Sequence, residues 1–404
     1  MSEVKTQQYL SDMVSNMAES ETIKMAQMAR DIAAQGHDVI SLSLGEPDFD
    51  TPVHIKEAAK KALDEGYTKY TPVPGLVELR EAIQRKFKRD NNLDFGLNQI
   101  VVSNGAKQTI ANVCLSLLNP GDDVVIFAPY WVSYRAIVEM VGANCIPVFA
   151  GIEEDYKPTP QAIEDAITDK TKLVIFSSPC NPTGSVFTKD ELHAIARVFE
   201  KYPHIHIISD EIYEYINFTE EGHVSLGAFP EVKDQVITVN GFAKGFAMTG
   251  WRLGYMGGPA WLAAACSKIQ GQFTSGATSF GQKAAAVALD SDLSPTYQMR
   301  DAFRKRKDLV LELLNDIPGM KVNQPKGAFY IFPDVSAFFG KTDGEVTIQD
   351  ADDLSTYIMN KAYVGTVAGG AFGAPNCFRI SYAASEEQLI EAISRIKRVL
   401  AQLH

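Results

Sequence analysis

The sequence has few cysteines, little positive charge and no long apolar run. Its five cysteines show no C-x-x-C spacing, which favours free thiols in a reducing cytoplasm over disulfides or a zinc site. No apolar stretch approaches the roughly 18 residues of a membrane span, and the N-terminal residues lack the apolar region of a signal peptide. The net charge of −12 argues against nucleic-acid or anionic membrane partners.

What remains is the composition of an ordinary globular enzyme. The chain has 404 residues, 46% of them hydrophobic and 22% charged, enough for two domains or for one large domain with an appendage. Apolar strand-like runs alternate with helical patterns through the middle of the chain, which predicts an α/β fold with a mostly parallel, doubly wound sheet. No Gly-x-Gly-x-x-Gly follows the first strand, so a dinucleotide-binding fold is disfavoured.

The most informative stretch runs from Asn240 to Tyr255 and reads NGFAKGFAMTGWRLGY. Small residues surround Lys244, so a bulky planar group could approach its amine, and desolvation there would favour the neutral, nucleophilic form. Arg252, eight residues later, carries a guanidinium suited to a phosphate. A Schiff-base lysine beside an anion-binding arginine is what pyridoxal 5′-phosphate (PLP) requires. The competing interpretation is a surface lysine in a glycine-rich turn.

This segment resembles the cofactor-lysine signature of the class I PLP-dependent aminotransferases, in particular prokaryotic aspartate aminotransferases. The similarity runs from about Ser41 to the C-terminus. It implies PLP fold type I and a homodimer with shared active sites. The implied domains are an N-terminal arm and part of the small domain (1–48), a large cofactor domain (49–295) and the rest of a small α+β domain (296–404). One departure is that Gly241 and Ala243 replace hydroxyl residues common in relatives, leaving fewer side-chain donors for the phosphate.

A phosphate site is predicted where a strand turns into a helix at Gly105, Ala106 and Lys107. Small residues there free backbone N–H groups, and the helix dipole adds attraction for an anion. Arg252 is expected to supply the counter-charge. The resemblance adds Tyr70, whose family equivalent reaches the phosphate of the other subunit; the alternative is a tyrosine packed in its own loop.

Four further residues are expected to hold the cofactor ring. By resemblance, Trp131 stacks on the pyridine and borders the substrate, and Asn181 and Tyr213 bond its phenolic oxygen. Asp210, at a strand end, could pair with the protonated ring nitrogen and keep the ring an electron sink. The alternatives are a packed tryptophan, a prolyl turn and a helix-capping aspartate.

The substrate carboxylate is assigned to Arg379, which stands inside an apolar strand where an unpaired charge is costly. A planar guanidinium suits a carboxylate, and this position matches the family arginine that binds it; a structural ion pair is the alternative. Gly45 and Asn181 match further substrate contacts. Residues near Ser20 to Lys24 are candidates, by position only, for binding the substrate side chain.

The predicted reaction is a ping-pong amino transfer in which Lys244 moves the α-proton as acid and base. Aspartate is the expected donor and 2-oxoglutarate the expected acceptor. Aromatic, prephenate and alanine aminotransferases stay open as alternatives. A PLP-binding transcriptional regulator is disfavoured, because few residues precede Ser41 to form a winged helix. No metal is expected, since His204 and His206 lack a third ligand in view.

Overall fold

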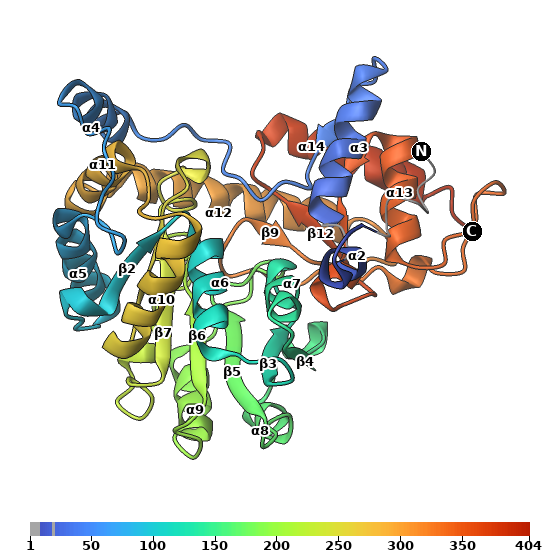
Figure 1. Cartoon of the computed structure of the whole chain (residues 1–404). Coiled ribbons are helices and arrows are strands. Elements are labelled where there is room, and N and C mark those ends of the chain that lie inside the picture. The colour runs from blue at the N-terminus through green and yellow to red at the C-terminus, as the bar shows by residue number, and fades with distance from the viewer. Residues whose placement is uncertain (1–8, 18–20) are drawn as a thin grey trace.

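A seven-stranded sheet forms the centre of the computed structural model, which describes residues 9–17 and 21–404 (Figure 1). Its strand order is β2-β8-β7-β6-β5-β3-β4, and only β8 runs antiparallel to its neighbours. The strands are β2 (Ile100–Ser103), β3 (Asp123–Ala128), β4 (Asn144–Phe149), β5 (Thr171–Ser177), β6 (His206–Asp210), β7 (Val236–Gly241) and β8 (Gly254–Gly257). The predicted mostly parallel, doubly wound sheet is confirmed.

Helices cover both faces of this sheet, which is why its central strands are apolar on both sides. One face packs under α6, α7 and α10, and the other packs under α8 and α9. The helices of this part are α4 (Val53–Asp64), α5 (Val77–Asn91), α6 (Ala106–Leu117), α7 (Ser133–Met140), α8 (Pro160–Asp165), α9 (Lys189–Phe199), α10 (Ala260–Phe273) and α11 (Ser279–Asp290).

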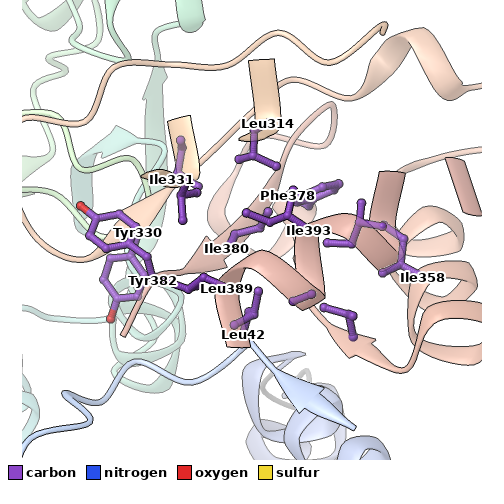
Figure 2. Packing of buried hydrophobic residues seen from close by; sticks show 14 of the residues in the cluster. Leu42, Leu314, Tyr330, Ile331, Ile358, Phe378, Ile380, Tyr382, Leu389 and Ile393 are labelled. Atoms are coloured by element: carbon purple, nitrogen blue, oxygen red, sulfur yellow. The ribbon is translucent and has the colours of Figure 1, made fainter. Parts of the chain in front are cut away.

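A second, smaller core lies beside the sheet and is built by both ends of the chain. Figure 2 shows its packing, in which Leu42 from the N-terminal side belongs to the same cluster as Phe378 and Leu389 from the C-terminal side. Its elements are β1 (Ile40–Ser41), α12 (Ser294–Asn315), β9 (Tyr330–Ile331), α13 (Ala351–Ala362), β10 (Val364–Gly365), β11 (Val367–Ala368), β12 (Phe378–Ser381) and α14 (Glu386–Leu400). Parallel pairing of β1 with β10 joins the two ends.

The chain crosses between the two cores twice. The first crossing runs from Leu42, in the smaller core, to α4 beside the sheet. The second is α12, which leaves the sheet region after α11 and packs Phe303 and Leu314 into the smaller core. These crossings place residues from both cores around a common cleft.

The described residues of the N-terminal region include helices α2 (Asp12–Asn16) and α3 (Glu21–Ala34). Met25 and Ala29 of α3 pack against Met359 of α13. None of the helices that the structure describes has the length and apolar character needed to cross a bilayer.

Candidate active site

A cavity of about 390 Å³ lies at the carboxyl ends of the parallel strands, where open α/β sheets bind their ligands. Its wall is completed by Gly45 from the first crossing and by Tyr330 and Arg379 from the smaller core. Every predicted site residue except Tyr70 lines this cavity: Gly45, Gly105, Ala106, Lys107, Trp131, Asn181, Asp210, Tyr213, Lys244, Arg252 and Arg379. Tyr70 is 97% exposed and lies outside it.

Lys244 is carried by the turn between β7 and β8. Phe242, Phe246 and Met248 of this turn are buried in a neighbouring apolar cluster, which fixes the turn against the sheet. The Lys244 amine donates a hydrogen bond to the carbonyl oxygen of Gly45. Burial, reinforced by the positive charge of Arg379, lowers the pKa of Lys244 to about 8. Roughly a tenth of this amine is therefore neutral at pH 7, far more than for an ordinary lysine, and this form can act as a nucleophile or base.

Asp210 ends strand β6 and is buried beneath the cavity. Burial raises the pKa of its carboxyl group to about 6. Two donors oppose this shift: the Tyr134 hydroxyl lies 2.6 Å from Oδ2, and the backbone N–H of Ile212 lies 3.2 Å from Oδ1. The carboxyl thus sits at the bottom of the site with its orientation fixed by hydrogen bonds, as pairing with a cationic ring nitrogen would require.

The anion end of the cavity is built around Gly105, which precedes helix α6 with a φ of +86°. A Cβ there would lie 3.0 Å from Cζ of Arg252, so glycine lets the guanidinium cover the turn. Arg252 is held by a 2.9 Å hydrogen bond from Nη1 to the Thr249 carbonyl. Lys107 adds a second cation, 5.0 Å from the centre of the Trp131 ring. No salt bridge to either cation occurs among the described residues, so both can bind an anionic ligand.

Arg379 projects from β12 and is only 2% exposed. Nη1 donates to Oδ1 of Asn181 at 2.9 Å and Nη2 to the Ser43 carbonyl at 2.6 Å, while Nε has no partner among residues 9–17 and 21–404. Its guanidinium is flanked by the rings of Tyr330 and Phe372, at 4.5 and 5.0 Å. In the described part of the chain no carboxylate neutralises it, so the alternative of a structural ion pair finds no partner there. A buried, unneutralised guanidinium calls for a carboxylate ligand.

Tyr213 meets Tyr330 through their hydroxyl groups, whose oxygens lie 2.8 Å apart. Burial raises the pKa of Tyr213 well above its usual value, so its hydroxyl stays neutral and can donate to a ligand oxygen. Glu46, beside Gly45, accepts a hydrogen bond from the Thr249 hydroxyl at the same cavity.

Sequence reasoning missed Tyr134, Tyr330 and Glu46. Tyr134 had a usable signal: it follows Trp131 by three residues, close to one helical turn, so both side chains can face the same cavity. Tyr330 and Glu46 gave no such signal, because their contacts with Tyr213 and Thr249 join segments far apart in the chain.

One group of potential metal ligands occurs among the described residues: Glu211, Glu214 and His223. The buried ammonium group of Lys86 pairs with Glu214 and donates to Asn91 at 2.5 Å. Lys86 therefore supplies the positive charge that these buried carboxylates need.

This fold and this site define an aminotransferase of fold type I. The sequence model of the aminotransferase class I and II family matches residues 37–396, and the chain belongs to that family. It is 44% identical to the bifunctional aspartate aminotransferase and glutamate/aspartate-prephenate aminotransferase of Petunia hybrida, over 100% of this chain and 85% of the relative. Identity to the aspartate/prephenate aminotransferase of Cereibacter sphaeroides is also 44%, over 98% and 99% of the two chains.

Solved structures agree with this assignment. The aspartate aminotransferase of Rhizobium meliloti superposes with a TM-score of 0.95 at 38% identity, covering 98% of this chain and 99% of the other. The Thermus thermophilus aspartate aminotransferase crystallised with maleate gives 0.91 at 39% identity, covering 96% and 99%. An aromatic aminotransferase from Pyrococcus horikoshii gives 0.85 at 38% identity, covering 93% and 98%.

Proposed function

We propose that this enzyme uses PLP to move the amino group of aspartate to a 2-oxo acid, with 2-oxoglutarate as the expected acceptor. The observation that carries the proposal is the convergence of Lys244, Asp210 and Arg379 on one cavity. The residues fit the cofactor: an amine of lowered pKa, a buried carboxyl and a glycine turn under a guanidinium match its aldehyde, ring nitrogen and phosphate. When bound, PLP supplies an electron sink for the substrate carbanion.

The protein's own groups then have distinct tasks. Arg379 binds the α-carboxylate of the amino acid and orients the Cα–H bond. The neutral amine of Lys244 would take the α-proton of the amino acid and, once protonated, would act as the acid later in the reaction. Asp210, as a carboxylate, would hold a positive charge at the ring nitrogen, and the Tyr213 hydroxyl would donate to the phenolic oxygen.

Aspartate also has a side-chain carboxylate, which needs a second cation. Among the residues that the structure describes, the basic ones that line the cavity are Lys107, Lys244, Arg252 and Arg379. Arg379 is assigned to the α-carboxylate, Lys244 to the chemistry and Arg252 to the phosphate, which leaves the amine of Lys107. The backbone N–H groups of Ala106 and Lys107 remain available for the phosphate.

The residues near Ser20 to Lys24, which were candidates for binding the substrate side chain, are less well placed than Lys107. Ser20 lies outside the described residues. Nζ of Lys24 lies 3.5 Å from Oε2 of Glu21, and the Lys24 side chain is 60% exposed. Lys24 does not line the cavity. Thr22 and Ile23 of the same helix do line it, and they contribute no charge.

Prephenate is a second candidate substrate, favoured by the names of the Petunia and Cereibacter relatives. It also carries two carboxylates, so the same pair of cations, Arg379 and Lys107, would suit it. Aromatic amino acids are supported by one solved neighbour alone among those described above.

We further propose a homodimer and a cytoplasmic location. The 97% exposure of Tyr70 supports the dimer, because a large side chain held away from its own subunit is available to a neighbouring one. The five free cysteines support a reducing compartment.

A single-turnover scan of the PLP-loaded enzyme tests the proposed function. Each amino acid is added in turn, and the loss of the visible absorbance band is followed. We expect the fastest loss with aspartate and glutamate. Fastest loss with phenylalanine, tyrosine or alanine would mean that this amino acid, and not aspartate, is the substrate. A visible band that never forms with added PLP would refute the role of Lys244.

A further inference from the structure

The turn that carries Lys244 is held on the side away from the cavity by two threonine hydroxyls. Thr296 Oγ1 donates to the carbonyl oxygen of Gly245 at 2.8 Å. Thr51 Oγ1 donates to the carbonyl oxygen of Ala247 at 2.6 Å, and it accepts a hydrogen bond from Nε1 of Trp251 at 3.1 Å. Both threonines are buried, with 8% of Thr51 and 2% of Thr296 exposed. Each hydroxyl thus satisfies a carbonyl that has little access to water.

The turn has weak internal support without these donors. Its internal backbone bonds are long: Ala247 N to Lys244 O measures 3.3 Å, and Met248 N to Ala243 O measures 3.2 Å. Ala247 also has a φ of +51°, a left-handed conformation that a residue with a Cβ adopts at a cost. Surrounding contacts must hold such a conformation in place, and the two hydroxyls supply polar contacts of this kind.

The two threonines stand on the two crossings between the cores. Thr51 follows Phe49, whose ring packs edge-on against Phe303 at 5.4 Å, and it precedes α4. Thr296 lies in the first turn of α12, which carries Phe303 into the smaller core. A cavity of about 230 Å³, lined by residues of both crossings and of the Lys244 turn, lies beside these bonds. Because apolar packing is incomplete there, the hydroxyl bonds take a larger part in fixing the turn.

We propose that Thr51 and Thr296 are positioning residues for Lys244, which tie its turn to both crossings and keep its amine directed into the active-site cavity. The idea rests on the proposed aminotransferase function. A general base must lie within hydrogen-bond reach of the proton it moves, and small displacements of such a group are costly. Loss of either hydroxyl is therefore expected to slow proton transfer while the substrate-binding groups, led by Arg379, stay in place.

The test compares T51V and T296V, which remove a hydroxyl at nearly constant shape, with T51S and T296S, which keep it. T366V serves as the matched control, because Thr366 is fully buried, its hydroxyl has no hydrogen-bond partner in the described part of the chain, and it does not line the cavity. Steady-state kinetics with aspartate gives kcat and KM. The pH dependence of reductive methylation at Lys244, followed by mass spectrometry on cofactor-free protein, gives the pKa of its amine.

We expect each valine variant to lower kcat about fivefold to tenfold, the factor that one neutral hydrogen bond supplies, with KM nearly unchanged. We also expect the pKa of Lys244 to rise toward its ordinary value, because a looser turn lets water reach the amine. Both serine variants and T366V should match the wild type in both measurements. A urea unfolding curve confirms that each variant is folded.

Valine variants with wild-type kcat and an unchanged Lys244 pKa would overturn the proposal. Serine variants as impaired as the valine ones would also overturn it, since the hydroxyl would not be the feature that matters. If one valine variant does not fold, the proposal is tested by the two serine variants and by the methylation profile of the other valine variant. A wild type that transaminates nothing would refute the proposed function, whereas the methylation profiles would still decide whether the threonines set the environment of Lys244.

Discussion

The hydroxyl of Tyr134 donates a 2.6 Å hydrogen bond to Oδ2 of Asp210, linking the helix after β3 to the end of β6. Both residues are buried, so the bond forms where the carboxylate has lost its water. It lowers the pKa of Asp210, against the larger effect of burial, which raises it to about 6. Tyr134 therefore increases the fraction of Asp210 that is ionised near neutral pH.

The first prediction is that Y134F raises the pKa of Asp210 further. A hydrogen bond to a charged group contributes about 1.5–3 kcal/mol, so the shift should be roughly one to two units. More Asp210 is then protonated at pH 6 to 7, and a protonated carboxyl pairs poorly with a cationic ring nitrogen. We expect the PLP dissociation constant of the variant to exceed the wild-type value most strongly at pH 6 and least at pH 9.

The matched control is Y156F, which removes a buried hydroxyl bonded to the Phe332 carbonyl, outside the cavity. It should leave the pH dependence of PLP binding unchanged. An equal loss of affinity for Y134F at every pH would contradict a role through the ionisation of Asp210.

The second prediction concerns stability without cofactor. The folded-state pKa of Asp210, about 6, lies above its usual 3.8, so the folded protein binds this proton more tightly than the unfolded chain. The resulting destabilisation is small at pH 4, grows as pH rises from 4 to 6, and is constant above about pH 6. D210N keeps an oxygen for Tyr134 and removes the buried charge. At pH 8 its free energy of unfolding, measured by urea titration, should exceed the wild-type value by roughly 2 kcal/mol. At pH 4 the two free energies should differ little.

Such a variant would bind PLP poorly while being more stable, as expected when a strained active-site group is removed. If D210N is no more stable than the wild type at pH 8, the carboxylate is better solvated than its burial indicates.

The sequence pattern predicted residues that the fold brings to one cavity, because they lie in long local motifs. Lys244 and Arg379 stand in different cores, yet each could be identified from its immediate neighbours, and both line one cavity. The alternation of apolar strands and helices was equally local, so the sheet was predictable.

The contacts that tune these positions were not predictable. Tyr134 meets Asp210 across 76 residues, and Thr51 meets Ala247 across 196. A tyrosine or threonine satisfies the same helix, turn or core pattern whether or not its hydroxyl reaches a distant partner. Such pairings follow only from how the finished elements pack.

The third prediction separates two roles for Lys107. K107M should lower kcat/KM for aspartate by about a hundredfold, because a buried side-chain carboxylate loses its charged partner, worth on the order of 3 kcal/mol. For alanine and phenylalanine the change should be small. The control K24M removes an exposed lysine paired with Glu21 and should behave as wild type. An equal loss for all amino acids, together with weaker PLP binding, would instead assign the Lys107 amine to the phosphate.

The fourth prediction tests the anion cradle through Gly254, a residue that makes no ligand contact of its own. Strand β8 passes so close to the turn before α6 that a Cβ on Gly254 would lie 2.5 Å from the carbonyl carbon of Gly105 and closer still to Ala106 N. Backbone atoms cannot rotate away, so G254A must displace the turn whose N–H groups are assigned to the phosphate. Overpacking of this kind costs about 1–3 kcal/mol, and we expect PLP affinity to fall roughly tenfold to a hundredfold.

Gly250 provides the matched control, because a Cβ there meets nothing within 4 Å. G250A should bind PLP as the wild type does in a fluorescence titration. At saturating PLP, G254A should recover a normal KM for aspartate, since Arg379 lies in the other core and is not displaced. Normal PLP affinity in G254A would mean that the turn at Gly105 and Ala106 does not hold the phosphate, and the anion site would have to be assigned to Arg252 alone.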